Sequence, residues 1–285
     1  MKIPEPTPDS GIKQILVALD TPGRSAELIE RAAMLALQLQ AGLTGLFVED
    51  INLLRLAALP FAHELPYDSL PERRLDQLLM ERALRARATA IQKHLASSAG
   101  RANIPWSFQV RRGHVLEELL ASAPTTDLLI IGEFDQTIVS AGDRPSMLRQ
   151  ILLHSSCSVW AQHCNPDSTR AVLVLYDASA TSNRALQLAS RMARDDTGQS
   201  LLVLLPPDGS PHSQKLQQRA AQHLGRDHLQ LRYLPLTEFS ASRLLAVMRQ
   251  QRGRVLVAAE ETLAAKPALL QQLADQLSFD FVLVR

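Results

Sequence analysis

The first part of the chain alternates between apolar and amphipathic segments. Residues 12–20, IKQILVALD, form a nearly continuous apolar run, which is typical of a strand buried on both faces of a parallel sheet. Turn-forming residues follow, and Ser25 is placed to cap a helix that extends to about Gln40 with apolar residues at helical spacing. Residues 43–48 predict a second strand. A strand, a helix and a strand with short connections form a right-handed βαβ unit.

A longer segment, residues 52–99, separates this unit from the next strands. Its prolines predict a short helix and an irregular loop, and a long helix rich in Arg and Ala then covers residues 72–99. Three predicted strands and two predicted helices follow: strands at 106–110, 127–131 and 157–161, and helices at 115–123 and 146–153. Five strands that alternate with helices predict a complete doubly wound α/β domain.

The second part of the chain repeats the first. The segment AVLVLYD at 171–177 matches the first strand at an offset of 157 positions, so that Asp177 corresponds to Asp20. The closing segments that begin at Pro145 and Pro267 match at an offset of 122 positions. A repeat of this length indicates a duplicated structural unit.

The repeat defines the expected domain organisation. We predict two tandem Rossmann-like α/β domains, residues 1–163 and 170–285, with a linker at 164–169. Each domain is expected to be a mainly parallel five-stranded sheet flanked by helices. The second domain is expected to be smaller and degenerate, because it lacks most of the helical segment and part of the late loop.

The charge composition excludes several classes of partner. The 285 residues include 30 Lys and Arg against 29 Asp and Glu, a net charge of +1, so no broad positive field attracts nucleic acid or an anionic membrane. Acidic residues are interleaved with the arginines of the long helix, which favours a solvated helix face over a nucleic-acid surface. We find neither a signal peptide nor an apolar stretch of the roughly 18 residues that a membrane span needs, and we predict a cytoplasmic protein.

Residues that commonly bind metals or catalyse reactions do not form recognisable patterns. Cys157 and Cys164 are too few for a disulfide framework or a four-ligand zinc site, and we expect two reduced thiols. His114 follows Gly113 and could reach the sheet edge where open α/β folds bind ligands, or could simply begin a helix. A Walker loop and a nucleophile elbow are both lacking, so we predict no metal site, no catalytic residues and no enzyme.

Five segments carry a resemblance to a known family: ILVALD at 15–20, LFVED at 46–50, RRGHVLEELL at 111–120, DLLIIG at 127–132 and SSCSVWA at 155–161. In this order and spacing they resemble the universal stress protein family over nearly the whole chain. The segment NLLRLAALPFA at 52–62 resembles a bacterial branch that is often built as tandem domains. The resemblance implies an adenine-nucleotide alpha hydrolase-like fold and a stress-response protein that acts by binding.

The resemblance also implies how the two domains pair. The closing strands, residues 157–161 and 279–284, are expected to pair across an intrachain interface. Each is apolar and lies at a sheet edge that would otherwise be exposed. A homodimer through other surfaces and an unidentified protein partner remain open, whereas nucleic acid and membrane are not expected as partners.

The nucleotide-binding members of the family have a glycine-rich loop after the fourth strand, because glycines let backbone N–H groups approach the phosphates beside a helix N-terminus. Here Gly132 keeps the first position, whereas Asp135 and Pro145 replace the other two glycines, and Ser146 follows. A carboxylate repels phosphate, and proline has no N–H to donate. Arg144 could neutralise Asp135 or bind an anion directly. The loop therefore predicts a structural role and a lost phosphate site.

Two further positions match the family's adenosine site. Asp20 corresponds to its acidic residue and Val48 to the strand residue that lines the adenine pocket, although a turn-capping Asp and a core valine would look the same. In the second domain the strand at 255–259 ends without a glycine, and the loop at 260–266 is short and begins with two glutamates. We expect no nucleotide there.

Two functions follow from these observations. The first is a nonenzymatic stress-response or regulatory binding protein without the family's full ATP-binding loop. The second is a small-ligand sensor that binds ATP, AMP or another anion in the cleft of the first domain, and no other cofactor is expected. The candidate binding residues of that cleft are Asp20, Val48, Gly132, Arg144 and Ser146. The two glycine replacements favour the first function.

Overall fold

The computed structural model describes residues 11–20, 22–60, 63–64, 73–74, 76–132, 146–163, 171–193, 200–207, 210–224, 230–264 and 266–285. The predicted linker at 164–169 lies outside the described residues, as do three residues of the predicted phosphate loop, Asp135, Arg144 and Pro145.

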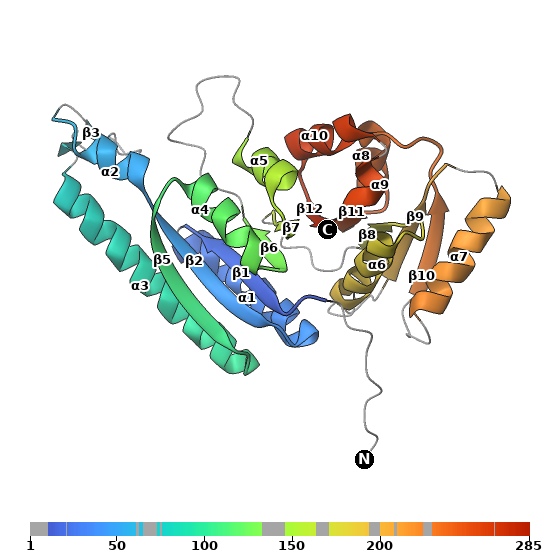
Figure 1. The fold of residues 1–285 in the computed structure, drawn as a ribbon, viewed down its shortest axis with the longest axis horizontal. Coiled ribbons are helices and arrows are strands. Elements are labelled where there is room, and N and C mark those ends of the chain that lie inside the picture. Colours follow the sequence, from blue (N-terminus) through green and yellow to red (C-terminus); the bar gives the residue numbers. More distant parts are fainter. Residues whose placement is uncertain are drawn as a thin grey trace, which may run out of the picture.

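Strands from both halves of the chain form one ten-stranded sheet, in the order β10-β9-β8-β11-β12-β7-β6-β1-β2-β5 (Figure 1). The first half supplies β1 (Gln14–Leu19), β2 (Gly42–Asp50), β5 (Trp106–Gly113), β6 (Leu128–Ile131) and β7 (Ser158–Ala161). The second half supplies β8 (Ala171–Leu175), β9 (Ser200–Leu205), β10 (Gln230–Pro235), β11 (Gly253–Ala259) and β12 (Asp280–Val284). All of these strand pairs are parallel except β7–β12, which is antiparallel. The predicted α/β class and the five-strand pattern of each half are confirmed.

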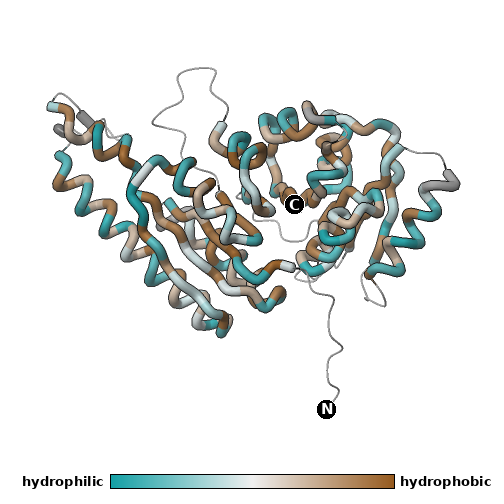
Figure 2. The backbone as a smooth tube through the Cα atoms, in the orientation of Figure 1, coloured by the Kyte–Doolittle hydropathy of each residue, from teal (hydrophilic) through white to brown (hydrophobic). Residues whose placement is uncertain are grey.

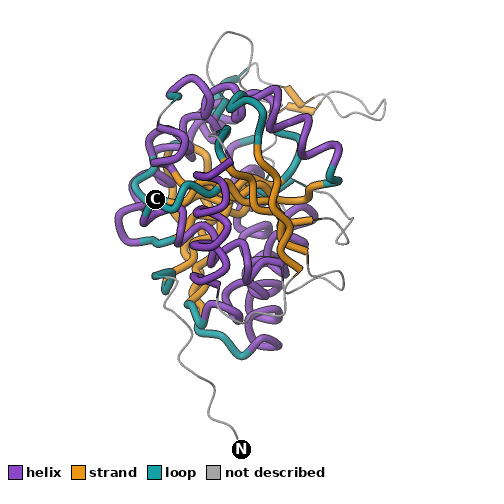
Figure 3. The backbone as a smooth tube through the Cα atoms, turned by 90° about the vertical axis from the view of Figure 1, so that its right-hand side faces the viewer, coloured by secondary structure: helices purple, strands orange, loops and turns teal. Residues whose placement is uncertain are grey.

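Helices cover both faces of this sheet (Figure 3). On one face lie α1 (Pro22–Leu39), α3 (Gln77–Ala102), α6 (Ala180–Ala193) and α7 (Ser210–Leu224). On the other lie α4 (Val115–Ser122), α5 (Met147–His154), α8 (Ala241–Gln250), α9 (Glu260–Ala264) and α10 (Pro267–Gln276). The remaining elements are α2 (Ile51–Ala57), the short 3-10 helix Ala123–Thr125 and a small antiparallel pair, β3 (His63–Glu64) with β4 (Arg73–Arg74).

Each face of the sheet has its own apolar core, and each core extends across both halves. In β1, Ile15 and Val17 belong to one core, and Leu16 and Ala18 belong to the other. Successive residues of a strand point to opposite faces, so a strand buried on both sides must be apolar throughout. Figure 2 shows this as brown strands beneath helices that carry both brown and teal positions. The continuous apolar runs of the sequence are thus explained.

Several element boundaries differ from the prediction. Helix α1 begins at Pro22, so Ser25 lies inside the first turns and does not cap it; proline is favoured at a first helical position because it needs no N–H partner there. Helix α3 begins at Gln77, because the Asp76 carboxylate accepts hydrogen bonds from the backbone N–H groups of Leu78 and Leu79 at 2.8 and 3.1 Å. Sequence reasoning missed the β3–β4 pair.

The two halves join through β7 and β12, as the family resemblance implied. Trp160 faces Val282 in this antiparallel ladder, and these two residues correspond to each other in the repeat. The backbone N–H of His163 donates to Asp280 Oδ1 at 2.9 Å, and that of Arg285 donates to Ser158 Oγ at 3.1 Å. These contacts are equivalent under the repeat, so the junction is a pseudo-twofold interface inside one chain.

A buried carboxylate sits at one end of this junction. Asp280 is 1% exposed and forms an ion pair with Arg31 of α1. It also accepts a hydrogen bond from Trp160 Nε1 at 3.3 Å, and the Arg31 guanidinium lies 5.2 Å from the centroid of the Trp160 ring. The carboxylate thus ties β12 of the second half to α1 and β7 of the first. A buried charge is tolerated only with such partners.

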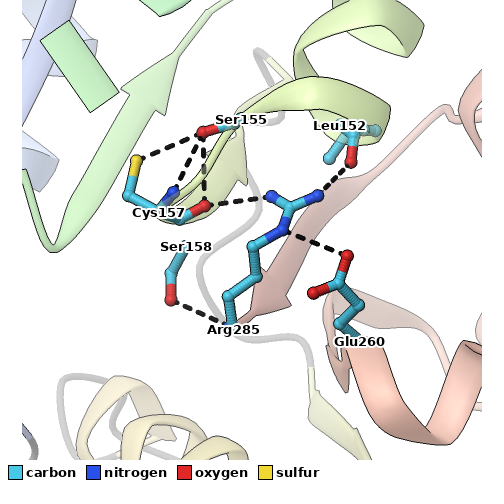
Figure 4. A network of polar contacts seen from close by, with 6 residues as sticks. All are labelled: Leu152, Ser155, Cys157, Ser158, Glu260 and Arg285. Atoms are coloured by element: carbon cyan, nitrogen blue, oxygen red, sulfur yellow. Dashed lines mark hydrogen bonds and ion pairs between the residues drawn. The ribbon is translucent and has the colours of Figure 1, made fainter. Parts of the chain in front are cut away.

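Arg285 makes the corresponding connections at the other end (Figure 4). Its guanidinium donates to the backbone carbonyls of Leu152 at 2.5 Å and Cys157 at 3.0 Å, and it pairs with Glu260 at 3.2 Å. The carbonyl of Leu152 lies in the last turn of α5, where carbonyls lack helical partners and a cation is favourable. Arg285 therefore joins α5 and β7 to the start of α9.

Candidate functional site

The topology of the first half creates a ligand-binding position of the doubly wound type. From β1 the chain passes to β2 on one side and later to β6 on the other, so the strand order reverses between β1 and β6. Crevices outside the carboxyl ends of strands at such a point are where open α/β sheets bind ligands.

Three of the predicted site residues meet at this edge. Leu19 of β1 is in register with Phe47 of β2, so Asp20 and Val48 come next on adjacent strands. Ala18 is in register with Ile131 of β6, and Gly132 follows one residue later. Val48 is partly buried against the core on the α4 and α5 face. The register of the sheet thus brings Asp20, Val48 and Gly132 together.

The fold does not require glycine at position 132. A Cβ atom added there would meet the side chain of Leu28 at 3.5 Å, which is ordinary van der Waals contact. By contrast, a Cβ at Gly45 would lie 2.7 Å from Leu95 Cδ2 and 3.0 Å from Phe108 Cδ2. Packing therefore explains Gly45, whereas Gly132 leaves space at the carboxyl end of β6.

Ser146 caps α5, the helix that returns from this edge. Its Oγ accepts a hydrogen bond from the backbone N–H of Arg149 at 3.2 Å. The cap satisfies one of the unpaired N–H groups at the helix start. Of the other two candidate residues, Ser146 thus lies at the start of α5, and Arg144 lies outside the described residues.

Sequence reasoning missed two polar residues of the same edge. Asp50 ends β2 and caps α2 by accepting from the Asn52 N–H at 2.8 Å. Asn52 Nδ2 lies 3.3 Å from Nδ1 of His114, which precedes α4 without making a side-chain cap. His114 therefore does begin a helix, and its ring is also held at the carboxyl ends of β2 and β5. The signal available in sequence was Asp50, a preferred helix cap directly after a strand.

Ion pairs hold this end of β5 in place. Glu49 of β2 is 7% exposed, and it binds the Arg112 guanidinium of β5 through Nε and Nη2, both at 2.9 Å. Arg111 donates to Ser122 Oγ of α4 at 3.1 Å and lies 3.5 Å from Glu118. Both arginines therefore have partners within the protein.

The corresponding edge of the second half is occupied by its own side chains. Asp177, the counterpart of Asp20, accepts a hydrogen bond from the backbone N–H of Ser179 at 2.9 Å. Burial acts to raise the pKa of Asp177, but hydrogen bonds from Ser179, Ser182 and Thr262 together outweigh it and the pKa is lowered. Ser179 Oγ in turn accepts from the Ser182 N–H at 3.1 Å. Asp177 thus stabilises the turn that begins α6.

A short helix and a lysine fill the rest of the second edge. The predicted loop at 260–266 contains helix α9 instead, which begins directly after β11 with Glu260 and Glu261 in its first turn. Carboxylates at a helix N-terminus satisfy the partial positive charge that a phosphate would use. Lys266, the counterpart of Arg144, donates to the Phe239 carbonyl at 2.6 Å.

Neither the family models nor the curated proteins give a significant match to this sequence. Several solved structures match the fold of this chain. A universal stress protein from Archaeoglobus fulgidus matches with a TM-score of 0.61 and 14% identity, over 95% of this chain and 96% of that one. A structure described as a universal stress protein from Pseudomonas aeruginosa matches with a TM-score of 0.57 and 16% identity, over 96% and 94% of the two chains. The chain has the universal stress protein fold in tandem form.

A third structure with this fold is a functionally unknown protein from Pseudomonas aeruginosa PAO1, with a TM-score of 0.52 and 17% identity over 96% of this chain and 93% of that one. In all three comparisons the match includes both halves. The universal stress protein fold and the tandem arrangement expected from the sequence are confirmed.

Three further observations concern metal binding, the thiol of Cys157 and membrane spans. In the described ranges, no three His, Cys, Asp or Glu side chains gather as a metal site would require. Cys157 is a free, buried cysteine, and burial raises the pKa of its thiol, which favours the unreactive protonated form. No described helix is long and apolar enough to cross a membrane.

Proposed function

We propose that this chain is a nonenzymatic member of the universal stress protein family, a regulatory binding protein in which two domains form one intrachain pseudo-dimer. The observation that carries the proposal is the closed edge of the second half, where Asp177, α9 and Lys266 make contacts within the protein in place of contacts to phosphates. The two glycine replacements in the first half, at 135 and 145, point the same way. Domain boundaries at 163 and 170 and a cytoplasmic location belong to this proposal.

In this proposal the protein presents surfaces to a partner and does not turn over a substrate. The edges through which β7 and β12 could pair with another molecule are used inside the chain. A homodimer would therefore form through other surfaces. A protein partner would bind the two pseudo-symmetric domains together, as a single surface.

Native mass spectrometry of freshly purified protein, followed by calorimetric titration with ATP, ADP and AMP, tests the proposal. We expect no copurified nucleotide and no saturable heat in the micromolar range. Copurified ATP or a micromolar dissociation constant would overturn it. A variant with glycine at 135 and 145 should gain ATP binding if the loop replacements are the cause.

The second function, a small-ligand sensor, is favoured by one observation on the first half. Gly132 is not needed for packing, and it lies beside Asp20 and Val48 at the switch point. Binding of ATP, AMP or another anion there would be weakened by Gly132→Ala, which adds a methyl group where the backbone would approach the ligand. A titration in which wild type and Gly132→Ala both bind equally would exclude this cleft as the site.

A further inference from the structure

The second half contains a pocket that lies apart from the edge described above. It has a volume of about 370 Å³ and lies between the start of α6 and the last turns of α7. Its lining residues are Tyr176, Ala178, Asn183, Arg219, Gln222 and His223. Asp177, α9 and Lys266, which close the second edge, do not line it. Its size is at the lower end of the range for small-molecule sites.

Two hydrogen bonds leave N–H groups of Asn183 and His223 available to donate in this pocket. The Tyr176 hydroxyl donates to Asn183 Oδ1 at 2.9 Å, which leaves both N–H groups of Asn183 to donate elsewhere. Gln187 Nε2 lies 2.9 Å from His223 Nε2. An amide nitrogen can only donate, so His223 Nε2 accepts and the ring proton lies on Nδ1.

The one formal charge that lines the pocket is positive. Arg219 carries five N–H donors and no acceptor. Burial raises the pKa of Tyr176; the positive charge of Arg219 opposes this rise, and the negative charge of Asp177 adds to it. In the part of the chain that the structure describes, Arg219 has no ion-pair partner. The nearby carboxylate of Asp177 is bonded to the Ser179 N–H instead.

The polar pair on the pocket floor is specific to the second half. In the repeat, Tyr176 corresponds to Leu19 and Asn183 to Ala26, so both counterparts are apolar. Core positions of α6 are apolar in both halves: Ala189 corresponds to Ala32, and both are fully buried. Packing alone would have tolerated apolar residues at 176 and 183, as it does in the first half.

The backbone beside the pocket is also unusual. Ala178 adopts φ 65°, a left-handed conformation that costs a non-glycine residue roughly 1 kcal/mol. Such conformations persist where the surroundings hold them, and they cluster at ligand sites.

We propose that the second half binds a small organic anion in this pocket, with its carboxylate or phosphate group held by Arg219 and by the N–H groups of Asn183 and His223. Arginine binds both groups through paired N–H donors. Tyr176 acts as a positioning residue, because its hydroxyl holds the Asn183 amide with the nitrogen free. This site goes beyond the proposed function and is independent of nucleotide binding in the first half.

Titration of the full chain with glycerol 3-phosphate, inorganic phosphate and succinate, at constant ionic strength, tests the site. We expect saturable binding of at least one probe, weakened at least tenfold in Arg219→Gln. Arg184→Gln is the matched control, since Arg184 is also an exposed arginine of this region and does not line the pocket. It should bind as wild type does. Tyr176→Phe should weaken binding about threefold while leaving the circular dichroism spectrum unchanged.

Three outcomes would overturn the site. The first is no saturable binding of any probe at tens of millimolar. The second is equal weakening in Arg219→Gln and Arg184→Gln, which would indicate only general charge attraction. The third is loss of binding in Gly132→Ala with retention in Arg219→Gln, which would place the anion in the first half. A response to succinate alone, or to the phosphates alone, identifies which acidic group is bound.

Discussion

In the first half of the protein, the chain leaves β6 at Gly132 and returns in α5 at Ser146, whereas in the second half it leaves β11 directly into α9. The strands on which these connections are built are equivalent in the repeat. At one edge Gly132 has room for a Cβ atom in ordinary contact with Leu28. At the other, Asp177 accepts from Ser179, Glu260 pairs with Arg285 and Lys266 donates to Phe239.

This difference shows which residues of a duplicated α/β unit must stay apolar to keep the fold and which can change. Strands and helix faces are held by two cores that run through both halves, so their apolar character is kept. The residues just beyond the strand ends lie outside these cores. They differ between the two halves, and the polar pocket beside α7 lies in the half whose sheet edge is occupied by its own side chains.

The largest expected change in stability comes from the β7–β12 junction, where the equivalent positions 158 and 280 carry a neutral serine and a charged aspartate. Asp280→Ala removes the partner of Arg31 and leaves a partly buried guanidinium unpaired, which should lower the free energy of unfolding by about 3 kcal/mol. Ser158→Ala, the repeat counterpart, removes one neutral hydrogen-bond acceptor and should cost about 1 kcal/mol. Urea denaturation followed by circular dichroism measures both. Equal costs would show that the two ends of the junction are energetically equivalent.

The next effect distinguishes glycines required by packing from the glycine at the candidate site. Gly45→Ala forces a methyl group to within 2.7 Å of Leu95 and should cost about 1–3 kcal/mol. Gly132→Ala should change stability by less than about 0.5 kcal/mol, because its methyl group would make only ordinary contacts. Thermal unfolding of the two variants tests the contrast. A large loss in Gly132→Ala would mean that the first edge is also determined by packing.

A smaller, pH-dependent effect is expected at Asp177. Its pKa is lower in the folded than in the unfolded protein, so it stabilises the fold above the unfolded pKa of about 4 and loses this contribution as the pH falls through the folded pKa. Asp177→Ala should therefore cost about 1 kcal/mol at pH 7, and the difference from wild type should shrink below about pH 4. Denaturation curves at several pH values measure it. A difference that does not change with pH would contradict the assigned hydrogen bonds.

The smallest effect is expected at Lys266. Its exposed ammonium donates to the Phe239 carbonyl, so Lys266→Met should cost less than about 0.5 kcal/mol. Lys215→Met, an exposed lysine of α7, is the control. Neither variant should gain ATP binding by calorimetry, because Asp177 and α9 still occupy the edge. Gain of binding in Lys266→Met alone would show that the lysine by itself closes the second half.

Much of the candidate site could be predicted because it depends on strand order. Asp20, Val48 and Gly132 each follow or end an apolar run, and parallel pairing brings such residues to one edge. The contact between Asn52 and His114 could not be predicted, because it joins residues 62 positions apart through the packing of α2 and α4. The pocket beside α6 and α7 was missed for the same reason, since its lining comes from these two helices and from the connection between β8 and α6.

The sequence by itself determined the layers and the repeat, because hydrophobic periodicity and the offset between the halves are local properties of the chain. The pairing of the closing strands was expected only from the family resemblance, and the structure shows it. Only the tertiary structure decided that Arg31 meets Asp280 across 249 positions, that α9 closes the second edge, and that Tyr176 orients Asn183 beside Arg219. The physical reason is that the partner of a polar side chain is chosen by sheet register and helix packing, which fix distances between residues that no spacing in the sequence relates.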